Sequence, residues 1–351
     1  MKKIDPLEVV GTYGSRIDAS AVEFLTRNDY ALYGMMRYFM GYTDEHLNVS
    51  SRAAGKRMRP GLMLLIADSY GLLEEAIPAA LSIELFHNFT LIHDDIVDHD
   101  ELRRGRPTVW KLWGVDHAIN TGDAQLILAL RALEKSELMR IPHSRTTALR
   151  TRLLDRYLEV IEGQYLDFTL TAAKLNAPSV TEEAYLLMTE KKTSKLIRAA
   201  TETTAILAGL AEEKVTALGD FGGKLGMAYQ LYDDWQGIWG VPEKTGKRRA
   251  GDIYERKKTL PVIHAYMHLN SSDKKRLEEL YDNDNLDEAM VAEVLDFFSK
   301  TDAQKILADY AARYKREAVE ALSHTELAPA TKKVLEQVTT SLVPDMVAAS
   351  R

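Results

Sequence analysis

Hydrophobic residues recur every three or four positions along most of the chain, the spacing that places them on one face of an α-helix. Runs with this spacing occupy residues 60–70, 76–98, 120–139, 151–170, 182–210, 213–238, 259–269, 287–298 and 303–322. Strictly alternating runs and the Asn-Gly or Asp-Gly pairs of tight hairpins do not accompany them, so helices are predicted rather than strands. Glycine and proline are expected to interrupt the helices at Gly71, Pro78, Gly105, Pro107, Pro142, Pro178, the stretch 240–251 and Pro261. The pattern predicts an all-α bundle around one core.

Composition adds limits to this prediction. The chain has 351 residues, of which 46% are hydrophobic and 28% charged, and no linker-like segment divides it, so a single domain over 1–351 is expected. It has no cysteine, which excludes disulfides and thiolate metal sites. Its longest apolar stretches, such as 62–67, are far shorter than the ~18 residues that span a bilayer, so we expect a cytoplasmic protein without a transmembrane segment. The net charge of −7 argues against general nucleic-acid binding.

Three aspartates interrupt the apolar run that ends near residue 97. Asp94 and Asp98 are four positions apart, so their carboxylates share one helix face at about 6 Å and repel each other unless a cation lies between them. Mg²⁺ is a hard cation that takes one or two carboxylates together with substrate phosphates. Asp95 lies beside them, and the basic group Arg103-Arg104-Gly105-Arg106 follows, which suits diphosphate oxygens. The alternative is a solvated acidic helix end, because D-D-x-x-D arises by chance in about 0.08 of chains this long.

A second acidic pair repeats this arrangement. Asp233 and Asp234 lie in an apolar helical run, with Gln230 one turn earlier on the same side. A basic stretch that contains Lys247 follows. Two acidic helices of this kind could face one another across a bundle core and hold several metal ions. The alternative, two unrelated acidic patches, is weakened by the apolar residues around both pairs.

Other polar residues suggest a second anion site and further cavity-lining groups. Lys56 and Arg59 precede a predicted helix that starts near Pro60, where free N–H groups favour an anion, and proline is expected to keep Arg59 out of helical dihedral angles. The alternative is an exposed basic loop. His87 lies two turns before Asp94 on the same face and is either a ligand contact or an ordinary core histidine. The remaining candidates are Gln164 with Asp167, and Lys192 with Thr193, which interrupt an apolar run.

Taken in order, these motifs resemble the trans-isoprenyl diphosphate synthases, or polyprenyl synthetases. The similar segments lie between about 55 and 261 and read GKRMRP, HNFTLIHDDIVDHDELRRGRPT, GQYLD, KKTSKLI, GMAYQLYDD, TGK and KKTLP. The absence of an insertion between Asp94 and Asp98 is most similar to archaeal and actinobacterial geranylgeranyl diphosphate synthases. The resemblance implies an all-α isoprenoid synthase fold with a central cavity, a homodimer, and a prenyltransferase. Such an enzyme condenses isopentenyl diphosphate with allylic diphosphates (dimethylallyl, geranyl, farnesyl) by Mg²⁺-assisted ionisation, condensation and elimination.

The resemblance also implies roles for individual residues. The groups implied to bind isopentenyl diphosphate are Gly55, Lys56, Arg59, His87 and Arg104. Those implied to contact the allylic diphosphate are Arg103, Lys192, Lys247 and Lys257. The implied ligands of three Mg²⁺ ions are Asp94, Asp98 and Asp233, supported by Asp95, Gln164, Asp167 and Asp234. Thr193 and Gln230 are implied to direct oxygens at the allylic carbon. Many members carry a further aspartate where this chain has Gly237, although archaeal and actinobacterial members often have glycine there too.

Product length in this family is set by bulky residues just before the first aspartates. Here Phe89 and Thr90 are the fifth and fourth residues upstream of Asp94, with Leu85 and Phe86 about one turn deeper. One aromatic residue at Phe89 without another at 90 resembles enzymes that make geranylgeranyl diphosphate (C20). Farnesyl (C15) and longer products remain alternatives. Two further classes are a class I terpene cyclase, against which GKRMRP and His87 argue, and a non-catalytic subunit of a heteromeric synthase, against which the three intact aspartates argue.

Overall fold

The computed structural model describes residues 5–50, 55–134, 140–241, 249–283 and 285–346 of the chain. Contacts between residues group the chain into two compact units. Unit 1 comprises Met1–Leu154, Ala199–Thr216 and Glu326–Val338, and unit 2 comprises Asp155–Arg198, Ala217–Thr325 and Thr339–Arg351. Each unit is described by itself, and the expected single domain stays a prediction.

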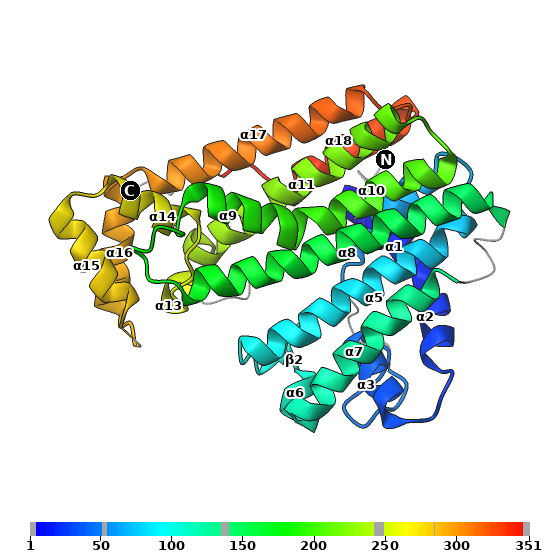
Figure 1. Cartoon of the computed structure of the whole chain (residues 1–351), viewed down its shortest axis with the longest axis horizontal. Coiled ribbons are helices and arrows are strands. Elements are labelled where there is room, and N and C mark those ends of the chain that lie inside the picture. Colours follow the sequence, from blue (N-terminus) through cyan, green and yellow to red (C-terminus); the bar gives the residue numbers. More distant parts are fainter. Residues whose placement is uncertain (1–4, 51–54, 135–139, 242–248, 284, 347–351) are drawn as a thin grey trace. The chain divides into compact units, whose positions relative to one another are not determined.

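The described residues of unit 1 are mostly helical, with one short hairpin and an isolated β-bridge between Thr43 and Val49 (Figure 1). Its elements are α1 (Pro6–Gly14), the 3₁₀ turn η1 (Ser15–Ile17), α2 (Asp18–Leu25), α3 (Ala31–Phe39), α4 (Met58–Asp68), α5 (Leu73–Val97), β1 (Leu102–Arg103), β2 (Arg106–Pro107), α6 (Val109–Trp113) and α7 (Val115–Ala132). Strands β1 and β2 pair antiparallel, with Arg103 opposite Arg106. The unit also includes parts of α8 (His143–Ala172), α10 (Lys195–Ala208), α11 (Glu212–Trp239) and α18 (Pro329–Leu342).

Helix α5 is the central helix of unit 1. Its side chains are buried on nearly all sides between Ala76 and Phe89, and α7 runs along it (Figure 1). A helix that is apolar all round is stable only inside a core, where burial of a Leu or Phe side chain contributes about 1.5–3 kcal/mol. Helix α1 packs directly on α4, because a Cβ at Gly61 would lie 2.2 Å from the carbonyl oxygen of Val10. Only glycine allows that approach.

Unit 2 contains the remaining helices (Figure 1). They are α9 (Glu182–Thr189), the π-helical segment η3 (Glu190–Ser194), α13 (Gly251–Tyr254), α14 (Leu260–His268), α15 (Ser271–Tyr281), α16 (Glu288–Lys300) and α17 (Ala303–Ser323), together with the other parts of α8, α10, α11 and α18. Their apolar faces form one core that includes Tyr185, Leu231, Ile253, Leu260 and Phe298. The all-α prediction is confirmed.

Two local predictions were wrong. Pro78 was expected to interrupt a helix, but it lies inside α5. Proline removes a single backbone hydrogen bond there, and the buried surroundings of the ring offset that loss. Arg59 was expected outside helical dihedral angles, but α4 begins at Met58 and includes it. Pro60 falls in the first turn, where backbone N–H groups have no helical partner, so the helix can begin ahead of the proline.

None of the helices that the structure describes combines the length and the hydrophobicity needed to cross a membrane.

Candidate functional site

The first acidic group lies at the C-terminal end of α5. Asp94 is half-buried, Asp98 is exposed and caps the helix, and the Asp98 N–H donates to the Asp94 carbonyl oxygen at 2.8 Å. The helix dipole is negative at this end, so two carboxylates here favour a bound cation. Among the described residues, no three Asp, Glu or His side chains form a ready-made metal cage. The two carboxylates of Asp94 and Asp98 suit Mg²⁺, which completes its coordination with water and substrate phosphates.

Asp95, between these two, points into the protein and fixes an arginine. Its side chain is 1% exposed and accepts a hydrogen bond from Nε of Arg103 on β1. Burial raises the pKa of Asp95 to about 6, while the positive charge of Arg103 acts in the opposite direction. Arg103 also lies 3.6 Å from Asp100. Asp95 therefore orients Arg103.

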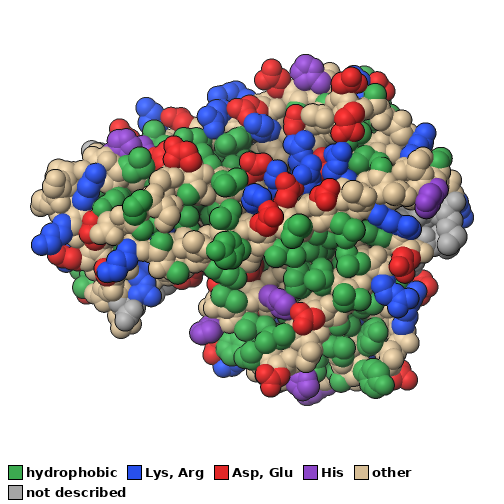
Figure 2. Space-filling view, in the orientation of Figure 1, with side chains coloured by type: hydrophobic (Ala, Val, Ile, Leu, Met, Phe, Trp, Pro, Cys, Tyr) green, Lys and Arg blue, Asp and Glu red, His purple; other side chains and the backbone are tan. Residues whose placement is uncertain are grey.

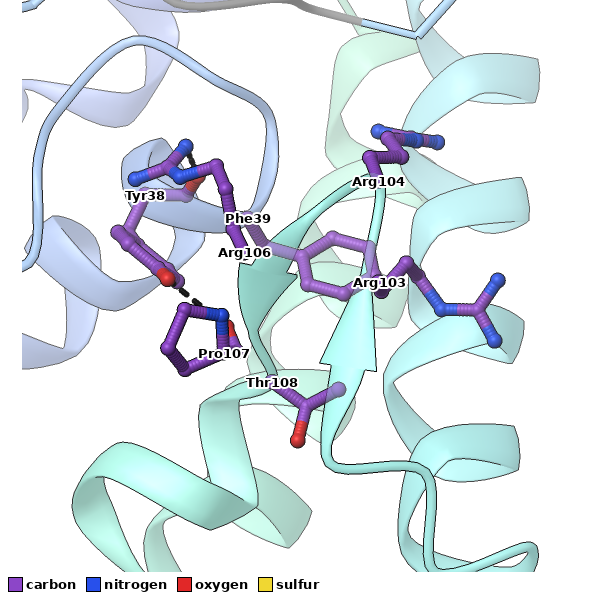
Figure 3. A pocket seen from close by; sticks show the side chains of 7 residues that line it. All are labelled: Tyr38, Phe39, Arg103, Arg104, Arg106, Pro107 and Thr108. Atoms are coloured by element: carbon purple, nitrogen blue, oxygen red, sulfur yellow. Dashed lines mark hydrogen bonds between the residues drawn. The ribbon is translucent and has the colours of Figure 1, made fainter. Parts of the chain in front are cut away.

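The hairpin that follows presents three arginines in different directions (Figure 3). Arg106 donates to the carbonyl oxygens of Tyr38 and Thr43 at 3.0 and 2.8 Å and stacks on the Tyr38 ring at 3.8 Å, so it holds the hairpin on α3. Arg103 extends toward α5, and Arg104 lies at the turn of the hairpin with its guanidinium 5.9 Å from the Phe39 ring centre. Arg104 has a positive φ of 54°, and its guanidinium packs over Gly55, where a Cβ would lie 2.9 Å from the guanidinium carbon.

Arg59 and His87 meet in the same unit. Nη1 of Arg59 lies 2.9 Å from Nε2 of His87. Because arginine can only donate, Nε2 accepts and the proton of the neutral ring is on Nδ1. Burial, followed by the charges of Arg59, Arg104, Arg103 and Arg57, lowers the pKa of His87 well below its ordinary value. The histidine is therefore a neutral group within a cationic cluster, and Lys56 lies exposed nearby in the sequence.

Arg57 is a site-supporting residue that the sequence reasoning missed. It occupies a left-handed conformation (φ 49°) and pairs with Glu84 at 2.7 Å, both side chains being 3% exposed. It also contacts Asp18 at 3.3 Å and donates to the Met40 carbonyl oxygen at 3.0 Å. This pairing ties the Lys56–Arg59 segment to α5 and to the N-terminal helices, for which the sequence offered no function. The signal was a glutamate among the buried apolar residues of α5.

In unit 2, Lys192 and Thr193 lie in the π-helical segment η3, which joins α9 to α10. Two glycines let neighbouring helices touch its backbone. A Cβ at Gly163 of α8 would lie 2.2 Å from the Lys192 nitrogen, and one at Gly226 of α11 would lie 2.6 Å from the Ser194 Cα. A π-bulge adds a residue to a helix and is frequent at functional sites. Here it explains why two polar residues fall inside an apolar run.

The polar side chains of unit 2 form two sets of contacts. Nζ of Lys192 pairs with Asp167 of α8 at 2.6 Å, and Gln164 lies half-buried one turn before Asp167. Thr193 donates to Oε1 of Gln230 at 2.8 Å, and Nε2 of Gln230 donates to Asp234 at 2.8 Å. The two sets place Lys192, Thr193 and Gln230 side by side within the unit.

Asp233 and Asp234 differ in the same way as Asp94 and Asp95. Asp233 is half-buried, whereas Asp234 is 6% exposed and accepts hydrogen bonds from Gln230 and from the hydroxyl of Tyr185 on α9. Burial, reinforced by the negative charges of Asp252 and Asp233, raises the pKa of Asp234 to about 7. Asp234 thus anchors Gln230, which leaves Asp233 as the candidate metal ligand on this helix. Tyr185 had no signal in the sequence.

Lys257 follows α13, and its Nζ lies 2.6 Å from Glu255 and 3.6 Å from Asp252. Lys247 lies outside the described residues. The expected meeting of the two acidic groups stays a prediction.

Comparison with known proteins identifies the family. The sequence model of the polyprenyl synthetase family matches residues 42–298, which include parts of both units. The chain belongs to the polyprenyl synthetase family.

Named relatives agree with this assignment. The chain is 39% identical over 277 residues to a (2E,6E)-farnesyl diphosphate synthase of Mycobacterium tuberculosis, covering 79% of this chain and 75% of that one. It is 39% identical over 255 residues to a geranylgeranyl diphosphate synthase of Methanosarcina mazei, covering 72% and 73%. The crystal structure of a polyprenyl synthetase from Streptomyces coelicolor A3(2) superposes with a TM-score of 0.84 at 29% identity, covering 96% and 99%. The relatives are trans-prenyltransferases, and so is this polyprenyl synthetase. The family substrates are isopentenyl and allylic diphosphates.

The residues expected to set product length in this polyprenyl synthetase line α5. Leu85 and Phe86 are fully buried, and Phe89 packs against Phe86 at 5.5 Å and against His93 at 4.9 Å between ring centres. Thr90 follows Phe89 in the sequence, and its hydroxyl donates to the His87 carbonyl oxygen at 2.8 Å.

His93 is a further residue that the sequence reasoning missed. A Cβ at Gly122 of α7 would lie 2.3 Å from Nε2 of His93, so glycine there admits the ring between α5 and α7. Phe86, Phe89 and His93 therefore form a continuous aromatic row along α5.

Proposed function

We propose that this polyprenyl synthetase elongates allylic diphosphates with isopentenyl diphosphate, head to tail, to an all-trans product that is mainly geranylgeranyl diphosphate (C20). The observation that carries the proposal is the single row formed by Phe86, Phe89 and His93, with the small Thr90 beside it. A class I cyclase and a non-catalytic subunit are not favoured, because the relatives are farnesyl and geranylgeranyl diphosphate synthases.

Magnesium is the proposed cofactor, with three ions in each active site; when bound, it neutralises charge on the departing diphosphate. Asp94 and Asp98 at the end of α5, and Asp233 on α11, would hold it. The helix-end position of the first pair and its oxygen-only donors support this choice. Asp95 and Asp234 would act by keeping Arg103 and Gln230 in place.

Two groups of cations would bind the two substrates. Lys56, Arg59 and Arg104, with Gly55 and neutral His87, would bind the diphosphate of isopentenyl diphosphate. Since Nδ1 of His87 carries a proton while Nε2 accepts from Arg59, the ring can donate to a phosphate oxygen without adding charge. Arg103, Lys192 and Lys257, and Lys247 from outside the described residues, would bind the allylic diphosphate.

The reaction we propose breaks the allylic C–O bond, and its electron pair leaves on the diphosphate. The double bond of isopentenyl diphosphate then attacks the allylic cation, and a proton passes to the departing diphosphate. Thr193 and Gln230 would stabilise the cation through oxygen lone pairs without attacking it. Their mutual hydrogen bond of 2.8 Å limits the rotation of both side chains, which is the preorganisation that electrostatic catalysis requires.

Product length follows from where the growing tail is stopped. One helical turn rises 5.4 Å, on the order of one isoprene unit, so each position along α5 corresponds to a different chain length. Phe89 would stop the tail, and Leu85 and Phe86 one turn deeper are covered by it. Farnesyl and longer products are the alternatives.

The test is product analysis with the purified full chain. Isopentenyl diphosphate, Mg²⁺ and each allylic starter in turn are incubated, and products are identified by radio-TLC and mass spectrometry. We expect C20 diphosphate from all three starters. A hydrocarbon formed without isopentenyl diphosphate would indicate a cyclase, and activity only with a second protein would indicate a partner subunit. A product that stops at C15, or continues past C20, contradicts the length assignment.

Two substitutions test the stop directly. Phe89→Ala removes the side chain that would block the tail, and we expect products longer than C20. Thr90→Phe adds a second aromatic side chain at the same level, and we expect shortening to C15. An unchanged C20 distribution in Phe89→Ala rules out this residue as the stop.

We also propose a homodimer. Exposed apolar residues recur along α8 at Leu158, Ile161, Tyr165 and Phe168, three or four positions apart, and Tyr165 is 69% exposed. A stripe with this spacing suits packing against another helix. Hydrophobic side chains also gather on the face over α7 (Figure 2), where Val115, Ile119 and Ile127 are exposed. A second copy of the chain is the partner that we infer.

Sedimentation velocity checks the dimer. Wild type is expected at twice the chain mass of 39.5 kDa. Tyr165→Glu is expected to shift it toward the single chain, whereas Thr171→Glu, at an exposed position on the same helix, is expected to leave it unchanged. Wild type that sediments as a single chain contradicts the proposal.

A further inference from the structure

The second acidic motif of this chain has a glycine, Gly237, where a further side chain would complete it. That place is filled from another part of unit 2. An ideal Cβ on Gly237 would lie 2.1 Å from Oδ2 and 2.5 Å from Cγ of Asp252. The Asp252 carboxylate therefore lies against the backbone of α11, where a side chain at 237 would otherwise begin.

The position of Asp252 is set by backbone packing. The residue belongs to the short helix α13, which Ala250 precedes in a left-handed conformation (φ 56°). Ala250 and Ile253 on either side are buried in the core of the unit. A Cβ at Gly251 would lie 4.0 Å from the carbonyl oxygen of Gly237, so the two backbones are close neighbours. Because the aspartate side chain is short and its backbone is held by packing, the carboxylate has little freedom to move away from Gly237.

The surroundings of Asp252 connect it to the candidate diphosphate groups. Its side chain is 15% exposed, and Oδ1 lies 3.6 Å from Nζ of Lys257. The backbone N–H of Lys257 donates to the Asp252 carbonyl oxygen at 2.9 Å.

We propose that Asp252 is a positioning residue that takes the place of the carboxylate missing at 237, so that the second acidic group consists of Asp233, Asp234 and Asp252. In this arrangement Gly237 has no side chain, and the Asp252 carboxylate occupies the space that a side chain would fill. Asp252 holds Lys257 toward the allylic diphosphate and adds negative charge where its divalent cation binds. The inference rests on the proposed function, because it assumes that Asp233 and Lys257 act on that diphosphate.

The first experiment measures metal binding without turnover. Mn²⁺ is titrated into the full chain in the presence of inorganic diphosphate, and free Mn²⁺ is followed by electron paramagnetic resonance. Asp252→Asn, which keeps the shape and removes the charge, is expected to weaken Mn²⁺ binding at least fivefold and to raise the allylic KM by a similar factor. Glu255→Gln is the matched control, because it removes the other, more exposed carboxylate beside Lys257, and is expected to stay within twofold of wild type.

The second experiment moves the charge. Gly237→Ala places an uncharged methyl group where the Asp252 carboxylate lies, so it is expected to displace that carboxylate and to weaken Mn²⁺ binding as Asp252→Asn does. The double variant Gly237→Asp with Asp252→Gly returns the carboxylate to α11 and is expected to recover binding to within twofold of wild type. Circular dichroism melting of each variant identifies those that fail to fold, and the single variants Asp252→Asn and Glu255→Gln then decide alone.

The outcomes separate the two proposals. If wild type forms prenyl diphosphates while Asp252→Asn matches wild type in Mn²⁺ affinity and allylic KM, the role of Asp252 is wrong and the proposed function stands. Equal losses in Asp252→Asn and Glu255→Gln also overturn it, because the effect would then come from either carboxylate beside Lys257 and not from Asp252 in particular. If wild type forms no prenyl diphosphate, the proposed function itself fails.

Discussion

The two units orient their polar groups by different means. In unit 1, arginines are held by buried acids, Arg57 by Glu84 and Arg103 by Asp95. In unit 2, close packing places the backbone of Lys192 and Thr193, because Gly163 and Gly226 allow two helices to touch the segment that contains them.

The difference follows from side-chain length. A guanidinium at the end of four rotatable bonds has a fixed direction only when a counter-charge binds it, and that counter-charge is strong only where water is excluded. The threonine hydroxyl is separated from the backbone by one rotatable bond, so placing the backbone largely places the oxygen. The proposed reaction handles both a diphosphate and an allylic cation, and it would use both solutions. The arginines of unit 1 are fixed by buried charge, and the Thr193 hydroxyl is fixed by close helix packing.

The largest expected effect tests the buried ion pairs of unit 1. Glu84→Gln leaves the buried Arg57 guanidinium with only the more distant and more exposed Asp18 as a counter-charge, and it is expected to lower the free energy of unfolding by about 3–5 kcal/mol. Urea denaturation measures this value. Glu74→Gln removes an exposed pair with Arg16 and is expected to cost less than about 1 kcal/mol. If the two variants lose the same small amount, the buried pair does not anchor the region.

The next prediction asks whether both regions carry catalysis. Asp94→Ala and Asp233→Ala are each expected to lower turnover at least 100-fold, because removal of a preorganised electrostatic contact costs about 3–4 kcal/mol in barrier. Steady-state rates with isopentenyl diphosphate and an allylic starter measure this. Asp116→Ala on the exposed side of α7 is the control. Near-normal rates from either site variant would refute the role assigned to that residue.

A smaller effect tests the close helix packing around residues 190–194 of unit 2. Gly226→Ala forces a methyl group against the Ser194 backbone and is expected to cost about 1–3 kcal/mol and to lower turnover about tenfold. Gly223 lies one turn earlier on the same helix, where a Cβ would meet nothing closer than 3.6 Å. Gly223→Ala is therefore expected to be neutral or to stabilise by up to ~1 kcal/mol. Thermal melts and rates of the pair measure the difference, and equal behaviour would mean that close packing does not place Thr193.

The smallest effect concerns pH in the charged region. The pKa of His87 lies well below its ordinary value of 6.5, so below that pH the unfolded chain takes up a proton that the folded chain does not. The free energy of unfolding is therefore expected to fall as pH decreases below 6.5, by at most about 1.4 kcal/mol per pH unit. His87→Gln removes this contribution, so its stability should depend less on pH between 7 and 5.5. Parallel curves for the two proteins would contradict a buried neutral histidine.

Long amphipathic helices were predictable from the sequence. The runs 76–98, 213–238 and 303–322 correspond closely to α5, α11 and α17. Helix α15 was missed because it is mostly charged, and α1 to α3 were left without assignment. A pattern of hydrophobic positions detects a helix only where one face is apolar along enough turns.

The candidate site divides in the same way. The paired aspartates and basic turns were visible because charge inside an apolar run is conspicuous. Arg57, Tyr185, His93 and Asp252 were not, because each pairs with or packs against a residue far away in the sequence, namely Glu84, Asp234, Gly122 and Gly237. Contacts of that kind depend on tertiary packing, which no local spacing encodes.

The π-helical segment has one more consequence. Its backbone bonds reach five residues ahead, as in the Lys195 N–H to Glu190 carbonyl contact, so it contains one residue more than an α-helical turn would. The widened turn absorbs this extra residue, so α9 and α10 keep the phase of one continuous helix on either side of it. Deleting a single residue from 190–194 would therefore restore an uninterrupted α-helix and leave that phase nearly unchanged, but it would remove the widened turn that holds Lys192 and Thr193. This segment is therefore expected to tolerate changes of residue type far better than changes of length.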